Sequence, residues 1–276
     1  MHPILFKIPV PFIEHELPVR SFGMLVMLGV IVGAWWLGRA LRRLQLGNTE
    51  TVSDLTTVAV LAGLLGARWL YLAIHPDSWR GPISLIALWD GGIVSFGGFV
   101  GGALGVIWLA RRKRLPLPSL ADTMLPALFL GQVFGRIGCF LVGDDYGAPW
   151  DGPWAVAFPK PEGGLIPDEL VGVPLHPSQL YLSALNLVIF VTGAAVLARR
   201  RFAGQAAVVV LALYGVGRFL IEFTRGDDVA RGIYGPLSTG QWLSLATLAL
   251  AGVLWVRLSA RQPQPADVVL RTAGAP

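Results

Sequence analysis

The sequence predicts an all-α, polytopic membrane protein with about seven transmembrane helices. Hydrophobic residues make up 54% of the chain and charged residues only 14%, and the mean hydropathy is +0.62. Apolar runs such as residues 22–38 and 241–256 approach the roughly 20 residues that a helix needs to cross a bilayer. Because these runs are continuous and do not alternate between apolar and polar residues, they favour helices over a closed barrel.

The apolar runs divide the chain into an N-terminal arm, a helical domain and a tail. The arm, residues 1–20, is broken by prolines and is expected to lie near the membrane surface. The helical domain covers residues 21–258 and contains the longest loop, residues 143–177, while residues 259–276 are expected to form a disordered cytoplasmic tail. We expect the spans at 21–40, 54–74, 93–110, 121–142, 178–198, 206–223 and 240–257.

The basic residues predict the orientation of the spans. They cluster after the first, third, fifth and seventh spans, which all end on one side if there are seven. The positive-inside rule then places the N-terminus outside and the C-terminus in the cytoplasm. Although the net charge is +5, no single domain gathers these residues, which argues against a nucleic-acid partner. The clustered residues are Arg39, Arg42, Arg43, Arg111, Arg112, Lys113, Arg114, Arg199, Arg200, Arg201, Arg257, Arg261 and Arg271.

Three arginines, Arg68, Arg136 and Arg218, lie inside predicted spans, in the half nearer the outer face. An arginine at that depth costs at least about 2.5–3.5 kcal/mol, so each predicts a compensating partner. Glu222 lies four residues after Arg218 on the same helix face. Structural ion pairing is one interpretation; the other is a phospholipid phosphate, which guanidinium groups bind bidentately.

The face of the sixth span that carries Arg218 extends to Tyr214 on one side and Arg225 on the other, which makes a polar stripe on an apolar helix. Asp144 follows the fourth span and marks where that helix meets water. The only cysteine, Cys139, excludes an intramolecular disulfide and any multi-cysteine metal site. We interpret it as a small packing residue.

Two further segments contain candidate site residues. Paired glycines, including Gly97 and Gly98, recur in the third span, where they suit either close helix packing or close approach to a ligand. His176 lies between two prolines at the start of the fifth span, and Gln179 follows on that helix. A histidine here is either structural or, since it lies on the same side as the arginines, functional.

With these pieces assembled, the chain resembles the bacterial prolipoprotein diacylglyceryl transferases. The resemblance covers about residues 20–257. It rests on FG at 22–23, GAR at 66–68, WDGG at 89–92, GG at 97–98, GRIGCF and the following glycines at 135–147, HPSQLY at 176–181, YGVGRFLIEFTRGDD at 214–228 and TGQWLSL at 239–245.

The resemblance implies transfer of the diacylglyceryl group of phosphatidylglycerol to the lipobox cysteine thiol of a preprolipoprotein, next to its signal peptide, with release of glycerol phosphate. It implies a bacterial inner-membrane enzyme whose active site faces the outer leaflet and which requires no metal or cofactor. Arg136 and Arg218 would bind the phosphate and Glu222 would orient Arg218. The remaining residues expected in the polar site are Arg68, Arg225, Tyr214, Gly97, Gly98, Gln179 and Asp144.

The chain departs from the family pattern at positions expected to take part in proton transfer. Many members have a histidine before the paired glycines of the third span, where this chain has Phe96, and asparagine where it has Cys139. The catalytic base is then His176, our first choice, or Asp144, Asp145 or Tyr214. The alternative is a paralogous transferase with another phospholipid or acceptor, or a non-enzymatic lipid-binding or transport protein.

Overall fold

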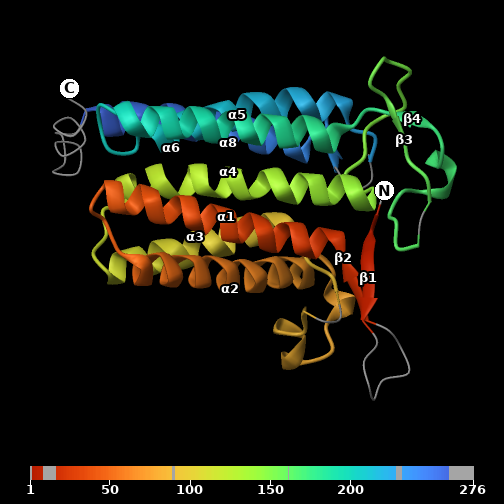
Figure 1. Ribbon diagram of the computed structural model, residues 1–276, viewed down its shortest axis with the longest axis horizontal. Helices are drawn as coiled ribbons and strands as arrows, with labels where there is room; N and C mark the ends of the chain where they lie inside the picture. Colours follow the sequence, from red (N-terminus) through yellow and green to blue (C-terminus); the bar gives the residue numbers. More distant parts are fainter. Residues whose placement is uncertain (1, 9–16, 89–90, 161, 228–231, 261–276) are drawn as a thin grey trace. The chain divides into compact units, whose positions relative to one another are not determined.

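The computed structural model describes residues 2–8, 17–88, 91–160, 162–227 and 232–260. Most of the predicted tail and the Trp89–Asp90 half of the WDGG motif therefore lie outside the described residues. The long helices are α1 (Ser21–Arg43), α2 (Thr49–Ile74), α3 (Ser95–Arg112), α4 (Leu117–Val142), α5 (Ser178–Arg199), α6 (Gln205–Ile221) and α8 (Thr239–Ser259), as Figure 1 shows.

Each predicted span coincides with one of these helices. Within the described residues, six helices are long and apolar enough to cross a membrane, and α3 is not among them. The prediction of a helical, multi-pass membrane protein is confirmed. The count of seven spans and the orientation of the termini remain predictions, as does the division into arm, helical domain and tail.

Among the residues that the structure describes, three small antiparallel strand pairs appear that the sequence did not predict. In the N-terminal arm, β1 (Ile4–Ile8) pairs with β2 (Leu17–Arg20). In the loop before α5, β3 (Val156–Ala157) pairs with β4 (Pro174–Leu175), and β5 (Ile233–Tyr234) pairs with β6 (Leu237–Ser238) just before α8.

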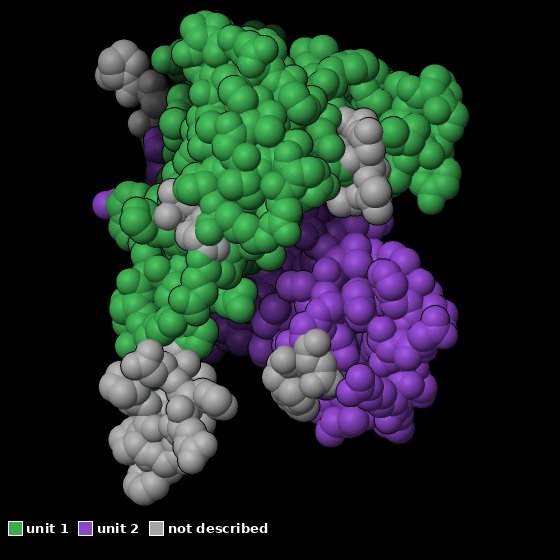
Figure 2. Space-filling view, turned by 90° about the vertical axis from the view of Figure 1, so that its right-hand side faces the viewer, with its two compact units in different colours: residues 1–36, 121–276 green, residues 37–120 purple. Residues whose placement is uncertain are grey.

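The chain forms two compact units, residues 1–36 with 121–276 and residues 37–120, which Figure 2 colours green and purple. In the smaller unit α2 and α3 run side by side, and glycines lie where they touch. A Cβ atom on Gly66 would lie 2.9 Å from the Cα of Gly101, closer than such atoms approach. Glycine is required there because any side chain would force the two helices apart.

The larger unit contains α4, α5, α6 and α8. Phe129 of α4, Ile189 of α5 and Val210 of α6 form one buried cluster between these helices. Nearer the end of the bundle, Phe202 and Val208 pack against Ala251 of α8. These contacts fix α6, the helix that carries Arg218, against its neighbours.

A buried carboxylate at the start of α4 anchors the start of α6. Asp122 accepts hydrogen bonds from the backbone N–H groups of Gly204 at 2.7 Å and Ala207 at 2.8 Å. It also forms an ion pair with Arg200, and both side chains are fully buried. Arg200, which the sequence placed among residues that set topology, thus also neutralises the carboxylate that caps α6.

The long loop between α4 and α5 is an ordered structure with its own core. Phe158, Ile166 and Leu175 are buried together, and Phe140 at the end of α4 packs against them. This core ties the loop to the end of α4, where Arg136 lies.

Candidate active site

After α4 ends, the chain turns back toward Arg136. After Val142 the helix stops at Gly143, whose φ of 80° is a left-handed conformation that suits glycine. The N–H groups of Gly143 and Asp144 both donate to the carbonyl oxygen of Cys139, at 2.9 and 3.1 Å. The turn thus brings the two aspartates that follow back over the last turns of the helix.

The carboxylate of Asp145 bridges two of the arginines predicted to belong to the site. One carboxylate oxygen accepts from Arg136 Nη1 at 2.5 Å, and the other accepts from Arg225 Nη2 at 2.5 Å. Arg225 also donates through Nε to Asp227 at 2.8 Å. Arg136 and Arg225, 89 residues apart in the chain, therefore meet at a single carboxylate.

Backbone pairing holds Arg225 in place. Residue 225 forms an isolated antiparallel bridge with Gly147, and the N–H of Ala148 donates to the carbonyl of Thr224 at 2.9 Å. These backbone contacts therefore hold the loop that follows α4 against the segment that follows α6. A Cβ atom on Gly147 would lie 2.5 Å from that of His176, so this contact needs a glycine.

The predicted pair of Arg218 and Glu222 is present. The two side chains form an ion pair with the i, i+4 spacing, and the Glu222 side chain is 2% exposed. Ser238 Oγ donates to Glu222 Oε1 at 2.7 Å. Ser238 is also the N-cap of α8 and accepts from the N–H of Gln241, so Glu222 links Arg218 to the start of α8. Ser238 is not among the site residues predicted from the sequence, although a serine three residues before a glutamine is a capping signal.

A pocket of about 230 Å³ lies beside this ion pair. It is lined by Glu222, Phe223, Arg225, Ile233, Pro236, Ser238 and Gln241. Charged and polar groups thus share its wall with apolar side chains, which suits an amphiphilic ligand.

The two aspartates after α4 have pKa values shifted in opposite directions. Partial burial and the charge of Asp145 raise the pKa of Asp144 above its usual range. Although burial works the other way, Arg136 and Arg225 hold the pKa of Asp145 below its usual range. Adjacent carboxylates with separated pKa values are typical of sites in which one takes up a proton while the other stays ionised.

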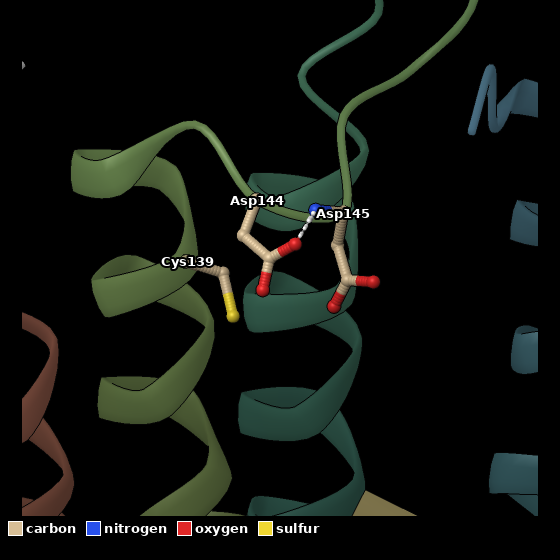
Figure 3. A group of neighbouring side chains, drawn as sticks. All are labelled: Cys139, Asp144 and Asp145. Carbon is tan, nitrogen blue, oxygen red and sulfur yellow. Dashed lines mark hydrogen bonds between the residues drawn. The ribbon is translucent and has the colours of Figure 1, made fainter. Parts of the chain in front are cut away.

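Cys139, Asp144 and Asp145 form a tight group, with one potential ligand atom of each within 4.8 Å of the others (Figure 3). Within the group the N–H of Asp145 donates to Asp144 Oδ1 at 2.9 Å. Because Arg136 and Arg225 already bind the two oxygens of Asp145, a metal ion coordinated by this carboxylate would compete with at least one of these ion pairs. Cys139 is buried and free, as expected for a packing residue.

His176 lies in an aromatic group. Its ring stacks on Trp150 with centroids 4.3 Å apart, and Nδ1 is 3.2 Å from the hydroxyl of Tyr181. Burial lowers the pKa of His176, which favours the neutral, proton-accepting imidazole. The backbone N–H of His176 donates to the carbonyl of Ala148 at 3.0 Å, in the loop that pairs with the segment of Arg225.

Gln179 and Tyr214 support the arginine cluster in different ways. Gln179 is fully buried and donates through Nε2 to the backbone carbonyl of Asp144 at 2.7 Å, which fixes the turn after α4. Tyr214 packs on Phe129 with ring centroids 5.2 Å apart. It lies within electrostatic range of both Arg136 and Arg218.

The other predicted site residues belong to the smaller unit. Arg68 is buried and donates through Nε to the carbonyl of Ser84 at 2.8 Å. It also donates through Nη1 to the carbonyls of Gly91 and Gly92. Both glycines have positive φ angles, 71° and 69°, which turn these carbonyls toward the guanidinium. Arg68 thus holds the loop before α3, a role that explains its burial without an acidic neighbour in its own helix.

Gly97 and Gly98 lie at the start of α3 and face α2. A Cβ atom on Gly97 would lie 2.6 Å from that of Leu70, whereas one on Gly98 would make ordinary contacts at 3.5 Å or more. Their packing role is therefore visible. Phe96, next to them, is 48% exposed.

Comparison with known proteins identifies the family. The family model for prolipoprotein diacylglyceryl transferase matches residues 3–257. The chain is 37% identical over 262 residues to the phosphatidylglycerol–prolipoprotein diacylglyceryl transferase of Geobacter sulfurreducens, covering 93% of this chain and 97% of that protein. It is 34% identical to the protein of that name from Bordetella parapertussis, over 92% and 96% of the two chains, and 33% identical to that from Trichormus variabilis, over 96% and 95%. The chain belongs to the prolipoprotein diacylglyceryl transferase family.

Proposed function

We propose that this protein transfers the diacylglyceryl group of phosphatidylglycerol to the lipobox cysteine thiol of a preprolipoprotein. Family membership and the names of the relatives support this reaction. The observation that carries it is the meeting of Arg136 and Arg225 at one carboxylate, 2.5 Å from each, since two guanidinium groups placed on one anion can also hold a phosphate.

In this reaction a carbon–sulfur bond forms and a carbon–oxygen bond breaks. The thiolate attacks the diacylglyceryl carbon that carries the phosphate oxygen, and glycerol phosphate leaves with that oxygen. Arg136, Arg218 and Arg225 stabilise the charge that develops on the leaving group. Glu222 holds Arg218 through their ion pair, and Ser238 holds Glu222.

The thiol must lose its proton, because the thiolate is the nucleophile. We assign this step to His176, whose lowered pKa keeps it neutral near pH 7. Asp144 is the alternative: the residue is partly accessible to solvent, it adjoins the arginine cluster, and partial burial raises its pKa. Phe96, at the family's usual histidine position, has no titratable group, so the base must come from elsewhere.

We place the site at the outer leaflet of a bacterial inner membrane, with the N-terminus outside and the loop of residues 143–177 on the same side. The ends of α4 and α6 that carry the arginines then lie at the depth of lipid headgroups. The amphiphilic lining of the pocket beside Glu222 supports a lipid substrate that enters from the bilayer.

The test is an assay of the purified full-length protein with labelled phosphatidylglycerol and a lipobox peptide. Release of glycerol phosphate together with a thioether-linked peptide supports the proposal, and a peptide with serine in place of cysteine is the matched control. Release with a different acceptor would assign another transfer reaction, and binding without turnover would indicate a lipid-binding or transport protein.

A further inference from the structure

Asp145 occupies the two arginines in the way that a phosphate would. It gives one oxygen to Arg136 and the other to Arg225, both at 2.5 Å. A phosphodiester also offers two charged oxygens, so the same guanidinium groups suit either ligand.

The balance of charge makes the two anions competitors. Each of the three arginines in the described cluster already faces a carboxylate: Arg218 faces Glu222, Arg225 faces Asp227 and Asp145, and Arg136 faces Asp145. A phosphate added to this arrangement would bring an uncompensated negative charge into a largely buried site, which is costly. Lipid binding is therefore favoured if one carboxylate leaves.

Asp145 is the carboxylate best suited to leave. Its side chain is 27% exposed, whereas those of Glu222 and Asp227 are 2% and 7% exposed. Its φ of 53° is a left-handed conformation that is uncommon outside glycine. The ion pairs to the arginines help to offset this conformation, so their replacement by a phosphate would free the residue to relax.

The arginines would stay in place after Asp145 leaves. Arg225 keeps its hydrogen bond to Asp227 and its backbone bridge to Gly147, and Arg136 lies within the continuous helix α4. The site thus has fixed cations and one displaceable anion.

We propose that Asp145 is an internal stand-in for the lipid phosphate: it holds Arg136 and Arg225 in register while the site is empty and is displaced when phosphatidylglycerol binds. This inference rests on the proposed function and adds a specificity residue to it. It implies that the affinity for the lipid is set by competition, and that Asp145 returns to the arginines as glycerol phosphate departs.

Two variants remove the competing charge and keep the backbone conformation, because asparagine and glycine both accept positive φ. Asp145→Asn and Asp145→Gly are measured for the Kd of labelled phosphatidylglycerol in detergent micelles, and for kcat and KM. We expect both variants to bind the lipid about tenfold more tightly than the wild type, with a lower KM and no rise in kcat. Asp168→Asn is the matched control: it removes an exposed carboxylate from the same loop, outside the arginine cluster, and should leave the Kd unchanged.

Weaker or unchanged lipid binding in both Asp145 variants would overturn the inference, because a carboxylate that only braces the arginines would make binding worse when removed. Lipid binding and turnover by the wild-type protein show whether a negative result concerns only the role of Asp145 or also the proposed function. If the wild type binds and turns over phosphatidylglycerol, only the role of Asp145 is at stake. If it does neither, the proposed function fails and the inference fails with it.

Discussion

Arg136 and Arg225 lie in segments far apart in the chain, yet both donate to the carboxylate of Asp145 at 2.5 Å. The contact depends on the turn after α4 and on the pairing of residues 147 and 225. It turns two isolated basic residues into one anion-binding group.

Acid should weaken the fold through Asp145. Because Arg136 and Arg225 lower the pKa of Asp145, its ion pairs contribute stability above the unfolded pKa, about 4, and this contribution is lost as the pH falls through the lowered folded pKa. We expect Asp145→Asn to have a lower Tm than the wild type at pH 7, with the difference shrinking on acidification. The check is thermal unfolding of both proteins across that range, and a difference independent of pH would contradict the assignment.

Removal of the buried charge at the start of α4 should destabilise the protein strongly. Asp122→Asn breaks the fully buried ion pair with Arg200, and breaking such a pair typically costs about 3–5 kcal/mol. The matched control is Asp54→Asn, which breaks an exposed pair with Lys113 and should have little effect. Thermal or denaturant unfolding in detergent measures both, and equal effects would refute the structural role of Asp122.

The paired glycines of α3 offer a test between packing and binding. Gly97→Ala would place a Cβ 2.6 Å from that of Leu70, while Gly98→Ala makes only ordinary contacts. We expect a large fall in Tm for Gly97→Ala and little change for Gly98→Ala. If both variants instead keep their stability and lose lipid affinity, the glycines contact the substrate.

The base can be identified from pH profiles of kcat/KM. We expect His176→Gln to lower kcat by about 10²–10⁴ and to remove an acid limb below pH 6.5, since burial lowers the pKa of His176. Asp144→Asn should keep that limb. A profile that loses its limb only in Asp144→Asn would transfer the role to Asp144.

Much of the architecture could be predicted because apolar runs and charge clusters are local signals. The spans, the Arg218–Glu222 pair and the family motifs all follow from residues close in sequence. The bridge at Asp145 could not be predicted, because it depends on a left-handed residue and on pairing between segments 80 residues apart. The contacts of Arg68 could not be predicted either. Arg68 donates to backbone carbonyls of two glycines with positive φ, and the sequence does not show where such carbonyls point.

Arg136 provides the most direct test of the central claim, that arginines at the ends of α4 and α6 bind the lipid phosphate. The measurement is turnover of labelled phosphatidylglycerol by Arg136→Gln, with Arg43→Gln, an exposed arginine at the end of α1, as the control. We predict that Arg136→Gln remains folded, as judged by its thermal unfolding, and loses turnover by about 10²–10³, the usual effect of removing one group that stabilises transition-state charge. The control should keep the wild-type rate. Wild-type turnover by a folded Arg136→Gln protein would contradict the account.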